Sequence, residues 1–108
     1  MKADFDNGKF VKDNETYKVI DITTLNGLIV SKTVLHPKKE TGGHKHAGQE
    51  EVYQFVHGNG TMQVDKQYFG VKSGDVVLIE DGVFHKVFNT SSHEDLVFVC
   101  VFDGKRSH

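Results

Sequence analysis

Two histidines that lie two residues apart, His44 and His46, are the clearest candidates for chemistry in this chain of 108 residues. Residues i and i+2 of an extended strand point to the same face, so both imidazoles can reach one point. Glu50 and Glu51 follow after enough chain for a bend, and because neighbours on a strand face opposite sides, only one of them can share that point. His85 is a third candidate far downstream. Imidazoles with one carboxylate form a nitrogen and oxygen site that suits divalent Fe, Mn, Co, Ni, Cu or Zn.

The choice between Glu50 and Glu51 decides which residues of the following strand face inward. If Glu51 faces inward, Tyr53, Phe55 and His57 share its side, and if Glu50 does, the residues at 52, 54 and 56 do. In the first case, Tyr53 and Phe55 form cavity wall. His57 and Tyr53 are then the candidates for moving protons or bonding a substrate. Gln63 is a further candidate for substrate contact, because one of two alternating pairs in its strand must line the interior.

Short β-rich segments separated by turn residues must position these side chains. No segment has a sustained apolar repeat at helical spacing. The pattern instead indicates about eight to ten short strands, which predict an all-β sandwich or barrel. Gly58-Asn-Gly60 indicates a tight turn between two paired strands. Residues 96–102 are apolar on both faces, so either a second copy in a homodimer or the N-terminal segment is expected to cover them. The candidate strands are residues 17–22, 28–35, 51–57, 61–64, 67–71, 76–79, 84–88 and 96–102.

Length and charge exclude several classes of protein. A chain of 108 residues is the usual size of one domain, and we expect a single domain over residues 1–108. The net charge of −2 argues against a nucleic-acid-binding protein. One cysteine, Cys100, forms no internal disulfide. The start of the chain lacks the apolar core of a signal peptide, and no apolar run suits a membrane span, so we expect a cytoplasmic protein without a membrane partner.

The spacing of these residues resembles the two motifs of the cupin superfamily. The first motif corresponds to His44-x-His46, four residues, Glu51, six residues and Gly58. The second corresponds to Gly74, five residues, Glu80, one residue, Gly82, two residues, His85, three residues and Asn89. The motifs span residues 38–89, with Lys38 where the family has glycine and Glu80 where it has proline.

The resemblance implies a small single-domain jelly-roll barrel with a metal inside it. It implies four metal ligands, His44, His46, Glu51 and His85, and it leaves Glu50 out. Asn89 is expected to organise its loop through bonds from its side chain to the backbone.

Four protein ligands leave about two positions open on an octahedral metal, which is typical of a catalytic or sensing site. The first expectation is a sugar or sugar-phosphate isomerase or epimerase that uses the metal as a Lewis acid, with His57 or Tyr53 as the base. The alternatives are an Fe(II)-dependent dioxygenase and a non-catalytic protein that binds a small ligand or sugar. In each of these three functions, the expected partner is a small-molecule ligand or substrate.

Overall fold

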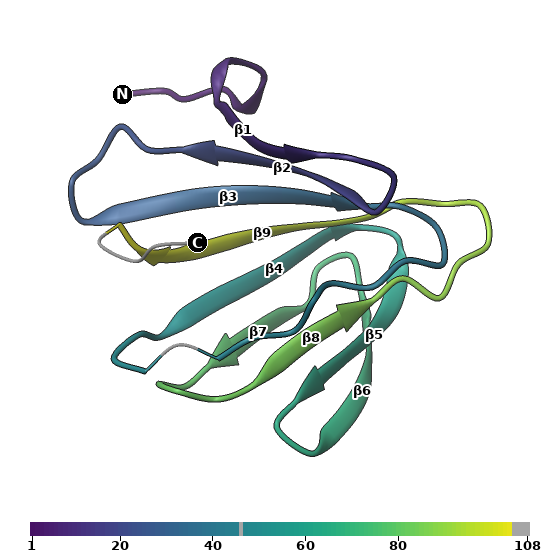
Figure 1. The fold of residues 1–108 in the computed structure, drawn as a ribbon. Helices are drawn as coiled ribbons and strands as arrows, with labels where there is room; N and C mark the ends of the chain where they lie inside the picture. The colour runs from purple at the N-terminus through teal and green to yellow at the C-terminus, as the bar shows by residue number, and fades with distance from the viewer. Residues whose placement is uncertain (46, 105–108) are drawn as a thin grey trace.

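Two antiparallel β-sheets form the fold in the computed structural model, which describes residues 1–45 and 47–104 (Figure 1). One sheet has the strand order β1-β2-β3-β9-β4-β7 and the other the order β6-β5-β8. The arrangement is a jelly-roll sandwich, which confirms the predicted all-β class. A short 3-10 helix, η1 (Phe5–Asn7), precedes the strands. The strands are β1 (Lys9–Asp13), β2 (Tyr17–Ile22), β3 (Leu28–Leu35), β4 (Glu51–His57), β5 (Asn59–Val64), β6 (Gln67–Lys72), β7 (Val76–Ile79), β8 (His85–Phe88) and β9 (Leu96–Asp103).

Within the described ranges, no helix has both the length and the apolar character that crossing a membrane requires.

Alternation of buried and less buried residues explains why the long strands face a common interior. In β3, the side chains of residues 29, 31, 33 and 35 are buried, while those between them are not. β9 follows the same rule, with residues 96, 98, 100 and 102 buried. Side chains that alternate in this way place one face of each strand in the core. The core includes Leu35, Phe55, Met62, Val87, Leu96 and Phe98.

The outer face of the six-stranded sheet carries mostly apolar residues and is only partly covered. The N-terminal segment covers one part of it, where Ile20 is 4% exposed and lies against Gly8. Further along the sheet, Val52 and Leu78 remain 39% and 69% exposed. The predicted N-terminal cover is therefore local, and a homodimer contact over the remainder stays a prediction. One row of cross-strand neighbours on this face is Val30, Val101, Val52 and Leu78.

The prediction that Gly58 joins two paired strands in a hairpin is wrong. β4 pairs with β7 and β9, whereas β5 pairs with β6 and β8, so the chain changes sheets at Gly58. Gly58 has φ +89°, and a Cβ there would collide with the carbonyl oxygen of Asp95. Only glycine fits this corner. The hairpin lies one strand later, between β5 and β6, where Asp65 has φ +54°.

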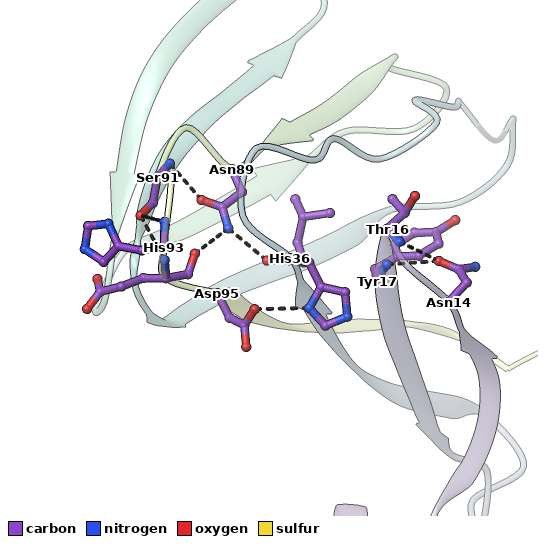
Figure 2. Close-up of polar contacts among 10 residues, drawn as sticks. Asn14, Thr16, Tyr17, His36, Asn89, Ser91, His93 and Asp95 are labelled. Carbon is purple, nitrogen blue, oxygen red and sulfur yellow. Dashed lines mark hydrogen bonds and ion pairs between the residues drawn. The ribbon is translucent and has the colours of Figure 1, made fainter.

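Asn89 holds together the connection between β8 and β9 (Figure 2). It is 3% exposed, and its amide nitrogen donates to the carbonyl oxygens of Leu35 at 2.9 Å and Glu94 at 2.8 Å. Its amide oxygen accepts from the backbone N–H of Ser91 at 3.0 Å. These bonds confirm the expected role of Asn89 in its loop.

Replacing Asn89 with alanine should lower the free energy of unfolding by about 2–3 kcal/mol, because buried backbone groups lose their partners. Chemical denaturation of the purified chain measures this change. Asn59→Ala is the control, since the Asn59 side chain is exposed and makes no hydrogen bond in the described ranges. Equal stability of the two variants would contradict the structural role of Asn89.

Candidate metal centre

Backbone pairing brings two distant segments together at the candidate site. The N–H of His44 donates to the carbonyl of His85 at 3.1 Å, and the N–H of His85 donates to the carbonyl of His44 at 3.0 Å. The two residues form an isolated antiparallel bridge, so their side chains leave the backbone on the same side. Their imidazole rings lie 4.5 Å apart between centroids, at an interplanar angle of 72°.

The loop that carries His44 is fixed on both sides of that residue. Gly43 has φ +71°, and a Cβ there would lie 2.7 Å from Cζ of Phe84. A larger residue would push the loop away from the segment that carries His85. Beyond His44, the N–H of Gly48 donates to the carboxylate of Asp81 at 2.5 Å, which ties the loop to the turn before β8.

Glu51 completes the cluster from the opposite sheet. It begins β4 on the inner face and is 5% exposed, beside the 3% exposed His85. One donor atom from each of His44, Glu51 and His85 lies within 4.8 Å of the others. A nitrogen, nitrogen and oxygen set at these separations can surround a single cation. Glu50, the residue before β4, is exposed, which agrees with the expectation that only one of the two neighbouring carboxylates faces the site.

The hydrogen bonds of His85 test whether this cluster fits a metal ion. Nδ1 lies 3.0 Å from the carbonyl oxygen of Val83, which only accepts, so the ring proton is assigned to Nδ1. Nε2 is buried and makes no hydrogen bond, although it lies 3.3 Å from Oε1 of Glu51. In neutral His85, two lone-pair atoms therefore face each other, an arrangement that a cation between them would satisfy. The donors suit a divalent transition metal.

His46, the remaining predicted ligand, lies outside the described residues.

A cavity of about 320 Å³ adjoins the cluster. Its wall includes His44 and Glu51, and Tyr53 also lines it, with its ring 5.5 Å from that of His85. A site of this volume is at the small end of the usual range for small-molecule pockets. The wall also includes four residues that neither the motifs nor the strand pattern identified as cavity residues, Lys12, Tyr17, Ser31 and Thr33. Tyr17, Ser31 and Thr33 lie on strands that the sequence pattern predicts. Lys12 lies on β1, which nothing in the sequence identifies.

The structure places two of the predicted cavity residues outside the cavity wall. Phe55 is fully buried in the core and does not line the cavity. Gln63 faces away from the interior, because Met62 takes the inward position and is 0% exposed. The amide nitrogen of Gln63 instead donates to the backbone carbonyl of Asp65 at 2.9 Å.

His57 does not reach the site, contrary to its expected place beside Glu51. The register between β4 and β9 shifts after Phe55, and His57 pairs with the outward-facing Val97. A β-bulge of this kind moves the next side chain to the other face of the strand. His57 is exposed at the end of β4 opposite to Glu51. It is therefore no candidate for a catalytic base in the cavity.

Comparison with known proteins gives one family and several relatives. Residues 31–102 match the family model Cupin_2, described as a cupin domain. The chain is 32% identical over 73 residues to an "Oxalate-binding protein" of Thermotoga maritima, a match covering 68% of this chain and 60% of the relative. It is 33% identical over 72 residues to an uncharacterized protein of Methanocaldococcus jannaschii, covering 67% of this chain and 51% of the relative. The chain thus spans little more than half the length of these relatives.

A solved structure shows the same fold. The crystal structure of a predicted oxalate decarboxylase from Thermotoga maritima superposes with a TM-score of 0.81 at 21% identity. The match covers 95% of this chain and 98% of that protein. At this identity the likeness concerns the fold.

Replacing His85 with alanine should reduce affinity for Zn²⁺ or Mn²⁺ by roughly 100-fold or more, because one of the few ligands is lost. Calorimetric titration of each metal measures the change. His93→Ala is the matched control, since His93 is exposed on a loop. Thermal melting followed by circular dichroism checks that the sheets persist, and His85→Gln repeats the test with less loss of volume. Unchanged metal affinity in a folded His85 variant would remove His85 from the ligand set.

Proposed function

The chain belongs to the cupin family, and from this membership we propose that it binds a small oxygen-rich anion at a divalent transition metal held in the barrel. The observation that carries the proposal is the convergence of His44, Glu51 and His85 within 4.8 Å at the edge of a cavity. We include His46 in the ligand set from the motif alone. A divalent metal, when bound there, supplies a Lewis acid for ligand oxygens.

The cavity beside the cluster supports a small ligand. Its volume of about 320 Å³ excludes a polymer from the interior. Tyr53 carries a hydroxyl on the cavity wall and is our candidate for a hydrogen bond to a ligand oxygen. The inner-face ring stack of Tyr53 and Phe98, with centroids 5.4 Å apart, fixes the direction of the Tyr53 ring.

The curated relative supports a carboxylate as the ligand. The protein of Thermotoga maritima is named for binding oxalate, and it shares 32% identity with this chain. Carboxylate oxygens are ligands that Fe, Mn and Zn accept readily beside imidazole. Oxalate is therefore the first probe for this site.

Isomerisation or epimerisation of a sugar or sugar phosphate is the second candidate. It requires a side chain that takes a proton from the substrate. Of the two bases predicted from the sequence, only Tyr53 lies at the cavity wall, and His57 lies outside it. For this reason we place ligand binding ahead of isomerisation. An Fe(II)-dependent dioxygenase needs iron, so the metal content of the purified protein decides whether this activity is tested next.

Oxalate should bind the Mn²⁺- or Zn²⁺-loaded chain, and removal of the metal with a chelator should abolish binding, because the ligand oxygens then lose their main partner. Isothermal titration calorimetry on the loaded and stripped chain measures this. His85→Ala should behave like the stripped protein, and His93→Ala should bind as the wild type does.

Oxalate binding that is unaffected by metal removal would contradict the proposal. Exchange of solvent deuterium into a sugar phosphate would instead favour the isomerase. Consumption of dioxygen by the iron-loaded chain would favour the dioxygenase.

A further inference from the structure

We propose that Lys12 and Tyr17 hold an anionic group of the ligand in the part of the cavity built by β1 and β2. This inference rests on the proposed function, in which oxalate is a probe, and it narrows the natural ligand to small hydroxylated anions with two oxyanion groups. One group lies toward the metal donors, and the second, a carboxylate or a phosphate, meets Lys12.

A β-bulge turns Lys12 toward the cavity. Phe10 pairs with the outer-face residue Ile20, whereas Lys12 pairs with the inner-face residue Val19, and the register shifts between them. With regular alternation, Lys12 would share the outer face of Phe10. The bulge places Lys12 on the cavity wall, and Lys12 is also exposed, so it lies where the cavity meets solvent. Bulges of this kind are common beside active sites, where they redirect a side chain.

The ammonium group of Lys12 is held in position. Its Nζ donates to the hydroxyl of Tyr17 at 2.9 Å and lies 5.2 Å from the centroid of the Tyr17 ring. The turn between the two residues is itself ordered by Asn14 (Figure 2). The amide oxygen of Asn14 accepts from the N–H groups of Thr16 at 2.9 Å and Tyr17 at 3.0 Å. A donor held in advance loses less conformational entropy when an anion binds.

The charge of Lys12 has no carboxylate partner in the described part of the chain. Among the described residues that line the cavity, it is also the only lysine or arginine. A cation in this position favours an anion over a neutral ligand, and the Tyr17 hydroxyl can donate to that anion. Its charge is separate from the cluster of His44, Glu51 and His85, which lies on other segments of the chain.

Two buried hydroxyls support a hydroxylated ligand. Ser31 and Thr33 are 4% and 7% exposed, and both line the cavity. Neither side chain makes a hydrogen bond within residues 1–45 and 47–104. Buried polar groups normally have partners, so hydroxyls that face a cavity are ready to bond a ligand or ordered water. Both lie on β3, between β2, which carries Tyr17, and β9.

The experiment compares ligands that differ by one oxyanion group. L-Malate and L-lactate share a hydroxy acid, but only malate has a second carboxylate. 3-Phosphoglycerate and glycerate differ by a phosphate. Each is titrated by calorimetry into the Mn²⁺-loaded chain and into its Lys12→Gln, Lys12→Arg and Lys18→Gln variants. Lys18 is the control because it lies on β2 but faces outward.

Lys12→Gln should lower the affinity for at least one of malate and 3-phosphoglycerate by about tenfold, because one charge-assisted bond is lost. The affinities for lactate and glycerate should stay within twofold of the wild-type values. Lys12→Arg should keep most of the wild-type affinity, and Lys18→Gln should change the affinity for none of the four ligands. The larger loss of affinity, for malate or for 3-phosphoglycerate, identifies the second group as a carboxylate or a phosphate. Metal content should be equal in all variants.

Equal losses for the ligands with one and with two oxyanion groups in Lys12→Gln, or no loss for either malate or 3-phosphoglycerate, would overturn the role of Lys12. If malate and 3-phosphoglycerate bind the wild-type chain equally well with and without metal, the proposed function fails, while a selective Lys12→Gln loss still supports the anion site. If none of the four ligands binds while oxalate does, the role of Lys12 is overturned and the proposed function stands, and if oxalate also fails to bind, both proposals are overturned.

Discussion

The antiparallel backbone pairing of His44 with His85 is the interaction on which the metal-donor cluster depends. It sets the separation of two imidazoles from segments far apart in the chain, through peptide groups rather than side chains. Glu51 lies on the six-stranded sheet and His85 on the three-stranded sheet, so the three donor residues connect the two sheets. A cation that fits this cluster would bind the folded chain more tightly than the unfolded chain. This difference in affinity would stabilise the fold.

Much of the strand framework could be predicted because burial imposes a period of two. The bounds predicted for residues 17–22, 28–35, 51–57 and 76–79 agree with the structure, since each stretch is rich in β-branched or aromatic residues and is limited by turn residues. The approach of His44, Glu51 and His85 was predicted from motif spacing. Local pattern could not show β1, which has lysine or aspartate at three of its five positions and depends on pairing with β2.

Two β-bulges account for the misplaced His57 and for Lys12, which the strand pattern did not identify. One in β4 turns His57 outward, and one in β1 turns Lys12 inward. The extra residues, Val56 and Val11, are ordinary strand formers, so nothing in the local sequence indicates a change of face. A bulge is set by how two strands register against each other, which is a property of the assembled sheet.

The position of β1 at the border of the larger sheet has an evolutionary consequence. β1 is hydrogen-bonded to β2 alone, whereas β4, which carries Glu51, lies between two strands. Substitutions in a border strand disturb few neighbours, so β1 can diverge while the cluster of His44, Glu51 and His85 is inherited unchanged. Relatives with the same cluster can thus acquire different ligand preferences through their N-terminal segments.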